Sequence, residues 1–170
     1  MDMNTKIKTG VPQKRRVFLR VWEPEDDDPE RRVDYYARIG RLEIEGWLYG
    51  GDRDDVKEVV RRALKAEDAL PEDVAKAVDL VVNYLAAGVQ LGLTVVAAAA
   101  GYDDKDGGVN IRAEMYYNDE GGWVVEVRVV YERPTGGAIV KKRVGLRRVT
   151  AEALRKVVVK VVRHAYNAHL

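Results

Sequence analysis

In six stretches of this chain every second residue is apolar, and the residues between them are mostly polar or aromatic. This alternation constrains the fold more than any other feature of the sequence. Period-two alternation with many β-branched and aromatic residues is typical of strands that bury one face. The stretches form two groups of three, within residues 16–49 and 109–146, and Gly- or Pro-containing turns separate the members of each group. The sequence therefore predicts an α+β protein with two three-stranded antiparallel units.

Three helices are predicted from apolar residues at helical spacing. Asp52 can cap the first, Pro71 begins the second, and Thr150 caps the third. No residue from Leu80 to Ala100 is charged, a length that would permit a membrane span, but the basic flanks that orient such a span are missing. We expect instead the order βββ-α-α-βββ-α around a buried central apolar helix. The sequence does not decide whether residues 89–99 are helix or strand.

The chain is short enough to form one domain. Residues 1–14 read as a flexible basic arm, because Gly and Pro oppose regular structure there, and 15–170 as a single α+β domain. Segments 16–66 and 109–169 share the order βββα, so an internal duplication is a hypothesis. The helical residues 56–63 and 158–165 of these segments are also similar in sequence. The alternative is that amphipathic helices built from Val, Ala, Lys and Arg resemble one another by chance.

Composition excludes several kinds of chemistry. The chain contains neither Cys nor Ser, so it has no disulfide, no thiolate–zinc site and no Ser or Cys nucleophile. Its two histidines, His164 and His169, are five residues apart, and a helix would point them in different directions. We therefore predict no metal, no cofactor and no catalytic residue.

The balance of residue types also suggests a source and a location. The charged fraction is 34%, and Gln is nearly absent, a bias that fits a thermophilic archaeon or its virus. The first sixteen residues contain no apolar core of a signal peptide, which predicts a cytoplasmic protein.

Charge is distributed unevenly along a chain whose net charge is only +1. Segments 1–20, 21–120 and 121–170 carry net charges of +5, −12 and +8. Such asymmetry suggests that the two basic ends face a polyanion. The alternative is that the acidic middle folds against the basic ends and cancels their field.

A first candidate surface is the aromatic face of the N-terminal unit, where aromatic rings alternate with guanidinium groups. Such rings can stack on unpaired bases. The alternative is that they are core residues, although buried Arg is costly without a partner. The candidate residues are Phe18, Arg20, Trp22, Tyr36, Arg38, Trp47 and Tyr49.

A second candidate surface is the basic C-terminal region. Like charges three or four residues apart destabilise a helix, so their presence suggests phosphate contacts. The alternatives are that they complement the helix dipole or pair with acidic residues of the middle segment. The candidates are Lys141, Arg143, Arg147, Arg148, Arg155, Lys156 and Lys160.

Residues 121–158 contain a Trp-led strand, a Gly hairpin, a basic third strand and a Thr-started helix. This outline resembles the DNA-reading modules at the start of tyrosine recombinases, which lay a sheet into the major groove. The doubled βββα order is similar to the Whirly family of single-strand binders, whose units have four strands. Neither family's diagnostic motif occurs in the chain, so both resemblances concern element order alone, and the chain is not identified as a member of either family.

Together these features predict a non-enzymatic protein that binds nucleic acid, preferably single-stranded DNA or RNA, as a homo-oligomer. No membrane or small-molecule substrate is inferred. The alternative is a protein–protein assembly or structural module that uses the same aromatic residues as anchors. A third reading is a metal-dependent nuclease built on Asp119, Glu126 and Arg128, although Arg replaces the Lys that such a site requires.

Overall fold

The computed structural model describes residues 2–6, 16–65, 69–102 and 106–168, and for residues 2–6 it describes the backbone alone. Eight strands and three helices occur in these ranges. In chain order they are β1 (Asp2–Lys6), β2 (Arg16–Trp22), β3 (Arg32–Ile39), β4 (Leu42–Tyr49), α1 (Arg53–Lys65), α2 (Glu72–Leu91), β5 (Val95–Tyr102), β6 (Gly108–Asn118), β7 (Gly122–Arg133), β8 (Gly136–Leu146) and α3 (Ala151–Asn167).

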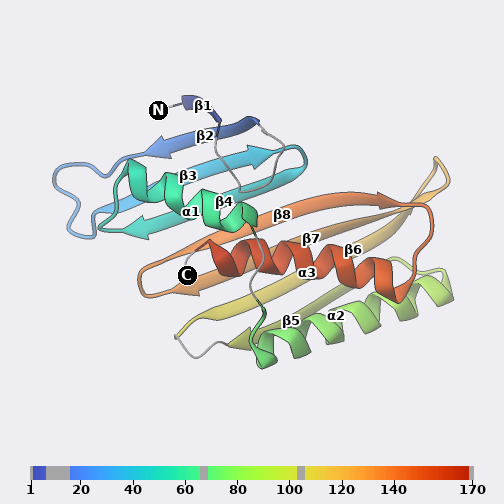
Figure 1. Cartoon of the computed structure of the whole chain (residues 1–170). Helices are drawn as coiled ribbons and strands as arrows, with labels where there is room; N and C mark the ends of the chain where they lie inside the picture. The colour runs from blue at the N-terminus through green and yellow to red at the C-terminus, as the bar shows by residue number, and fades with distance from the viewer. Residues whose placement is uncertain (1, 7–15, 66–68, 103–105, 169–170) are drawn as a thin grey trace.

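All eight strands belong to one antiparallel sheet, in the order β1-β2-β3-β4-β8-β7-β6-β5 (Figure 1). Each half is a meander of four strands followed by a helix, α1 in the first half and α3 in the second. The halves join where β4 pairs with β8, from Leu42 opposite Lys142 to Leu48 opposite Gly136. The predicted α+β class and element order are confirmed, and each unit gains a fourth strand, β1 or β5.

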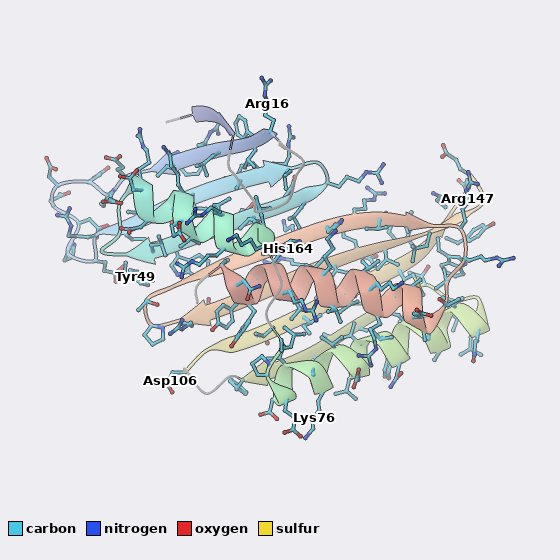
Figure 2. All side chains as sticks on the ribbon, viewed as in Figure 1. Arg16, Tyr49, Lys76, Asp106, Arg147 and His164 are labelled. Atoms are coloured by element: carbon cyan, nitrogen blue, oxygen red, sulfur yellow. The ribbon has the colours of Figure 1, made fainter. Side chains whose placement is uncertain are left out.

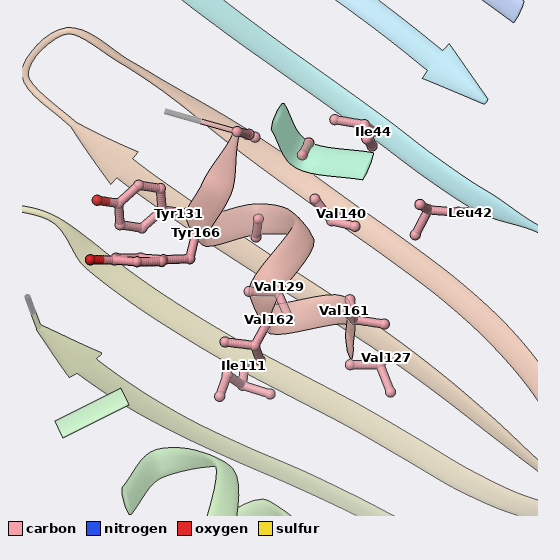
Figure 3. Close-up of a cluster of buried hydrophobic side chains, with 14 of the residues drawn as sticks. Leu42, Ile44, Ile111, Val127, Val129, Tyr131, Val140, Val161, Val162 and Tyr166 are labelled. Carbon is pink, nitrogen blue, oxygen red and sulfur yellow. The ribbon is translucent and has the colours of Figure 1, made fainter. Parts of the chain in front are cut away.

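The three helices lie on the same face of the sheet (Figure 1), and the buried apolar side chains of the strands lie on that face. Alternation fixes this face, because successive residues of a strand point to opposite sides. At the centre, Val161, Val162 and Tyr166 of α3 lie above Val127, Val129 and other buried residues of β6, β7, β8 and β4 (Figure 3). The ring centroids of Tyr131 and Tyr166 are 5.5 Å apart in an edge-on arrangement. The core is therefore one layer between the sheet and the helices.

Short turns set the register of the strands within each half. Gly40 (φ +58°) is the first of two residues between β3 and β4, and Gly121 (φ +89°) is the last of three between β6 and β7. Both positions require a positive φ, which Gly adopts without strain. Pro134 and Thr135 make the two-residue turn between β7 and β8. These turns determine which side chains lie opposite one another on the sheet.

The N-terminal segment differs from the predicted arm. Asp2–Lys6 form an edge strand antiparallel to β2, with Met3 opposite Leu19. The Gly and Pro that argued against regular structure lie in residues 7–15, outside the described residues. Asp2–Lys6 show no clear alternation, and they form a strand because they pair with the free edge of β2.

The apolar central segment also differs from the predicted buried helix. The helix ends at Leu91, where Gly92 adopts a left-handed conformation, and the chain returns as strand β5 at the edge of the sheet. By length and composition α2 is the one helix among the described residues that could cross a membrane, and 39% of its apolar window is buried. The helix is therefore covered on one face rather than on all sides.

Two glycines let α2 and β5 pack closely. A side chain at Gly88 of α2 would overlap Val95, and a Cβ at Gly101 would lie 2.8 Å from the Asp73 carbonyl oxygen. This close packing explains why the charge-free run divides into a helix and a strand that cover one another.

His164 fills the contact between α1 and α3. Its Nδ1–H donates a hydrogen bond to the Ala63 carbonyl of α1, and the side chain is 4% exposed. Burial lowers the pKa of His164 from 6.5 to about 4, and the positive charges of Lys160 and Lys142 act in the same direction. The imidazole is therefore neutral in the folded protein at pH 7.

Replacing Gly46 should destabilise the sheet. Gly46 lies opposite Tyr35, and a Cβ there would overlap the Tyr35 ring, which is 2% exposed. We expect Gly46→Ala to lower the free energy of unfolding by about 1–3 kcal/mol, measured by urea denaturation. The control is Gly145→Ala in β8, where nothing lies within 4 Å of the added Cβ and stability should be unchanged or slightly higher. Equal effects of the two variants would contradict this packing.

His164 should make stability depend on pH. Its pKa is lower in the folded than in the unfolded protein, so between pH 6.5 and about 4 the unfolded chain binds the extra proton. The free energy of unfolding should therefore fall as the pH drops from 7 towards 4, with a slope that approaches about 1.4 kcal/mol per pH unit. His164→Gln can still donate to Ala63 but does not titrate, so its stability should fall less over this range. Parallel stability curves of wild type and variant from pH 7 to pH 5 would contradict the buried neutral imidazole.

Candidate nucleic-acid interface

The face of the sheet opposite the helices carries a row of side chains that crosses seven strands. The cross-strand pairs are continuous because each residue lies opposite the next in the register of the sheet. From β2 to β5 the row reads Phe18, Arg38, Glu43, Lys141, Arg128, Arg112 and Ala98. We call Lys141, Arg128 and Arg112, which are consecutive in it, the basic row.

The basic row places three cations directly opposite one another. Neighbouring strands are about 4.8 Å apart, so the three side chains start within about 10 Å. Arg112 and Arg128 are exposed, Lys141 is half-buried, and none of the three forms an ion pair among the described residues. Like charges directly opposite in a sheet destabilise it. The arrangement therefore costs stability unless a polyanion covers it.

The aromatic candidates lie on the same face, in the half of the sheet formed by β2, β3 and β4. Trp22 is 45% exposed and Tyr49 is 40% exposed, and the other rings are half-buried. The rings of Phe18 and Tyr36 meet edge-on, with centroids 6.3 Å apart. The interpretation that these rings belong to the core is therefore wrong, because the core lies on the opposite side of the sheet.

Guanidinium groups lie over several of these rings. The Arg20 guanidinium is 5.9 Å from the Phe18 ring centroid and 5.5 Å from that of Trp22. In the other half of the sheet, the Arg143 guanidinium is 5.7 Å from the Tyr116 ring centroid. Arg and aromatic side chains therefore already stack on one another across this face.

A hollow of about 460 Å³ lies at the β2–β4 end of this face, with Trp22, Tyr36 and Trp47 among its walls. Trp47 lies on the bare backbone of Gly137, since any side chain there would overlap the indole. The Arg32 guanidinium is 5.2 Å from the Trp47 ring centroid. Trp47 therefore packs against both Gly137 and Arg32 at this hollow.

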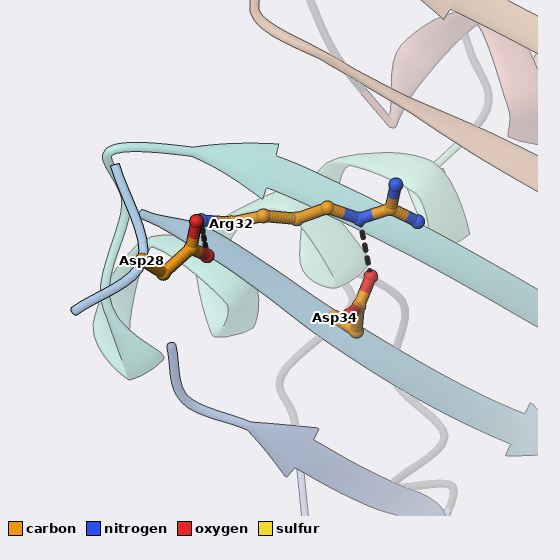
Figure 4. A network of polar contacts seen from close by, with 3 residues as sticks. All are labelled: Asp28, Arg32 and Asp34. Carbon is orange, nitrogen blue, oxygen red and sulfur yellow. Dashed lines mark hydrogen bonds and ion pairs between the residues drawn. The ribbon is translucent and has the colours of Figure 1, made fainter. Parts of the chain in front are cut away.

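Arg32 is held in place at both ends. Its backbone N–H donates to Asp28 Oδ2 at 3.1 Å, and its Nε–H donates to Asp34 Oδ1 at 2.8 Å (Figure 4). The hydrogen bond to Asp34 raises the pKa of Arg32. Because Asp34 already neutralises this cation, Arg32 orients Trp47 more than it adds positive charge.

Carboxylates are interspersed among the cations of this face. Glu43 interrupts the row between Arg38 and Lys141 and lies near Tyr36 of β3. Partial burial, followed by the charge of Glu43, raises the pKa of Tyr36. Glu126 lies opposite both Arg143 and Glu114. Positive charge is therefore concentrated in the basic row rather than spread over the whole sheet.

The second candidate surface is divided by the fold. Lys141 and Arg143 are on the helix-free face of β8, whereas Arg147 and Arg148 are exposed in the connection from β8 to α3. Arg147 and Tyr49 lie at opposite ends of the molecule (Figure 2).

The helix candidates lie on the other side of the molecule. Arg155, Lys156 and Lys160 are exposed on α3, on the side of that helix that faces away from the sheet. Arg155 pairs with Asp79 of α2, and the Lys156 amine is 3.7 Å from the Glu152 carboxylate. The prediction that these residues join the strand cations in one surface is wrong, because α3 packs on the helix-covered face.

Two cations of the basic row were missed as candidates. Arg112 was not selected at all, and Arg128 was considered only in a nuclease site. Their alignment follows from the turns at 119–121 and 134–135, which fix the register of β6, β7 and β8. Counting residues across those two turns would have found the row from the sequence.

The nuclease candidates Asp119, Glu126 and Arg128 are not part of a three-ligand metal site among the described residues. Asp119 lies in the turn after β6, while Glu126 and Arg128 point outward from β7. No group of three or more His, Asp or Glu residues that could hold a metal ion occurs among the described residues. The arrangement offers two opposed carboxylates, Glu114 and Glu126, and no more.

Neutralising the middle of the basic row should stabilise the protein. We expect Arg128→Gln to raise the free energy of unfolding by about 0.2–1 kcal/mol, because it removes the repulsion from both neighbours. Urea denaturation at low salt measures this change, which should shrink as salt is added. The control is Lys156→Gln, which removes the same charge from an exposed pair with Glu152 and should not stabilise. A destabilised Arg128→Gln would show that the three cations do not repel one another in the folded protein.

Comparisons with known proteins return no match to the chain among protein-family models, curated proteins or solved structures. The thermophilic archaeal source and the cytoplasmic location remain predictions. The surface chemistry of the sheet is therefore the basis for assigning a function.

Proposed function

We propose that this protein binds nucleic acid, preferably single-stranded, on the helix-free face of its sheet. The observation that supports this most is the basic row, three directly opposed cations without ion pairs among the described residues. Phosphate oxygens are the ligands that would relieve their mutual repulsion.

Exposed rings on the same face support single strands over duplex. Trp22, Tyr36 and Trp47 line a hollow of about 460 Å³, and Arg20 lies over the Trp22 ring. Bases can stack on such rings only when they are unpaired, and each stack contributes about 1–3 kcal/mol. The sheet therefore offers a phosphate site in one half and a stacking site in the other.

The two sites lie in neighbouring rows of the sheet, because Tyr36 is opposite Arg20 and Glu45, one row away from the row of Arg38 and Lys141. Arg38 belongs to the same cross-strand row as Lys141, and Arg20 lies two residues along β2 from Phe18. A strand that lies across β3, β4 and β8 would contact both sites. Glu43 and Glu45 of β4 lie on this path. The phosphates of the bound strand would therefore contact Arg38 on one side of these carboxylates and Lys141 on the other, rather than the carboxylates themselves.

The test compares two double variants with the same change of charge on opposite faces. Arg112→Glu with Arg128→Glu reverses the basic row, and Lys156→Glu with Lys160→Glu reverses two cations of α3. Fluorescence anisotropy with labelled single-stranded DNA, duplex DNA and RNA is measured over a salt series. We expect the row variant to weaken binding and to make the plot of log affinity against log salt shallower by about 1.4, which corresponds to two lost phosphate contacts on a single strand. The α3 variant should bind nearly as wild type does.

Trp22→Ala tests the stacking site in the same assay. Its ring is among the most exposed of the set, so its removal should leave the fold intact and weaken single-strand binding by about tenfold or more. Duplex binding, if any, should change less. Equal losses in the two charge variants would place binding elsewhere, and no binding by wild type at low salt would refute the proposal.

The alternative is a protein–protein module that uses the same face. The carboxylates between the cations favour it, since a protein partner can match both signs of charge while nucleic acid matches one. If wild type binds none of the three nucleic acids at low salt, this alternative replaces the proposal.

A further inference from the structure

A second surface, unrelated to the basic row, lies at the far edge of the sheet. There β5 is the last strand, and α2 lies along it (Figure 1). Large apolar side chains are exposed at this edge: Leu80 (63%), Tyr84 (68%) and Leu91 (71%) on α2, and Leu93 (54%) in the connection to β5.

The exposed residues of α2 form one stripe. Leu80, Tyr84, Ala87 and Leu91 are spaced by four, three and four residues, the spacing of a helix that packs against another helix. No charged residue interrupts the stripe between Leu80 and Leu91. We call these four residues the α2 stripe.

The direction of the stripe follows from helix geometry. Successive residues turn by about 100°, so Val78, Val81 and Leu85, which are buried against the core, point about 120° away from the stripe. Asp79, which pairs with Arg155 of α3, points about 110° away on the other side. The α2 stripe therefore faces away from α3, towards the open edge beside β5.

β5 itself lacks the features that protect a free edge. It runs eight residues, from Val95 to Tyr102, and contains only Val, Ala, Gly and Tyr. Native edge strands are blunted by charges, prolines, bulges or short length. The opposite edge has one such feature, since β1 is only five residues long. Among the described residues no strand pairs with the outer side of β5.

We infer that the β5 edge and the α2 stripe are the interface with a second copy of this chain. Around a two-fold axis, β5 would pair antiparallel with β5 of the copy, and the two α2 stripes would pack against each other. This inference does not depend on nucleic-acid binding.

Three observations favour a second copy over other occupants. A lipid surface could cover the stripe but cannot hydrogen-bond to the free backbone groups of β5. A copy supplies a strand of matching length without charge, and all the other pairs of this sheet are antiparallel too. Two-fold pairing also places the acidic first turn of α2 (Glu72, Asp73) near the C-terminus of the other α2, so the two acidic ends stay apart.

The chain already contains one interface in which two strands pair and two helices pack together over them. β4 and β8 pair antiparallel at the centre of the sheet, and α1 and α3 close over that pair through His164 and Ala63. The inferred interface repeats this arrangement between two chains, with β5 as the strand and α2 as the helix.

The test is the mass of the protein in solution, measured by sedimentation equilibrium over a wide concentration range. Wild type should sediment as a dimer, at twice the 19.1 kDa of the chain. Leu80→Glu with Tyr84→Glu should weaken dimerisation by about a hundredfold or more, because both glutamates would be buried without a partner. Asn83→Glu adds a charge to the neighbouring polar side of the same helix and should remain dimeric. Circular dichroism checks that both variants stay folded.

Hydrogen exchange gives a second readout that does not depend on the double variant. Backbone amides of β5 should exchange slowly in the dimer and faster at concentrations where wild type dissociates. A wild type that is monomeric at all concentrations would overturn the inference, and so would a double variant that remains dimeric. A monomer that binds phosphatidylcholine vesicles through α2 would replace the second copy with a membrane surface.

Discussion

The pairing of β4 with β8 decides what the rest of this molecule can present. Two meanders, each with its own helix, meet along seven residue pairs whose members are 88 to 100 positions apart in the sequence. Without that joint there would be two four-stranded sheets with two more free edges. With it, one sheet has a continuous face on which side chains from β2 to β5 align. The same joint brings α1 beside α3 and buries His164 between them, which makes the helix layer continuous as well.

Much of the local structure could be read from the sequence, whereas the order of the strands across the whole sheet could not. The alternation of Val109, Ile111 and Ala113, or the Thr150 cap that accepts a hydrogen bond from the Ala153 N–H, acts over a few residues and leaves a clear pattern. The pairing of β4 with β8 depends on contacts between distant segments and leaves no local pattern. The free edge that turns Asp2–Lys6 into a strand is likewise a property of the folded sheet.

The candidate site shows the same division. The aromatic face and its exposure follow from alternation once the side that the helices cover is known, and the sequence does not say which side that is. Lys156 and Lys160 were grouped with Lys141 because they are near in sequence and share a charge. Their separation depends on α3 crossing to the buried face, where its apolar residues Val158 and Val162 direct the lysines outward. Charge along the chain was therefore a poor guide to charge on the surface.

Both proposed surfaces lower the stability of the isolated chain, compared with a chain that has neutral residues at the first surface and polar residues at the second. Arg112, Arg128 and Lys141 repel one another where neutral residues would not, and the α2 stripe leaves leucine and tyrosine in water beside an unprotected strand. A sequence under selection for folding alone has no reason to keep either feature.

The two surfaces also share one geometric element. The row that contains Arg112 ends on Ala98 of β5, the strand that would pair with its copy. In such a dimer the two basic rows would lie on one continuous face, and the two β6 strands that carry Arg112 would be about 14 Å apart, across three strand spacings. Ala98 and Ala100 would form a neutral, low strip between them. A single strand long enough to contact both rows would cross that strip without meeting a carboxylate, so dimerisation would double the number of phosphate contacts without adding a new kind of site.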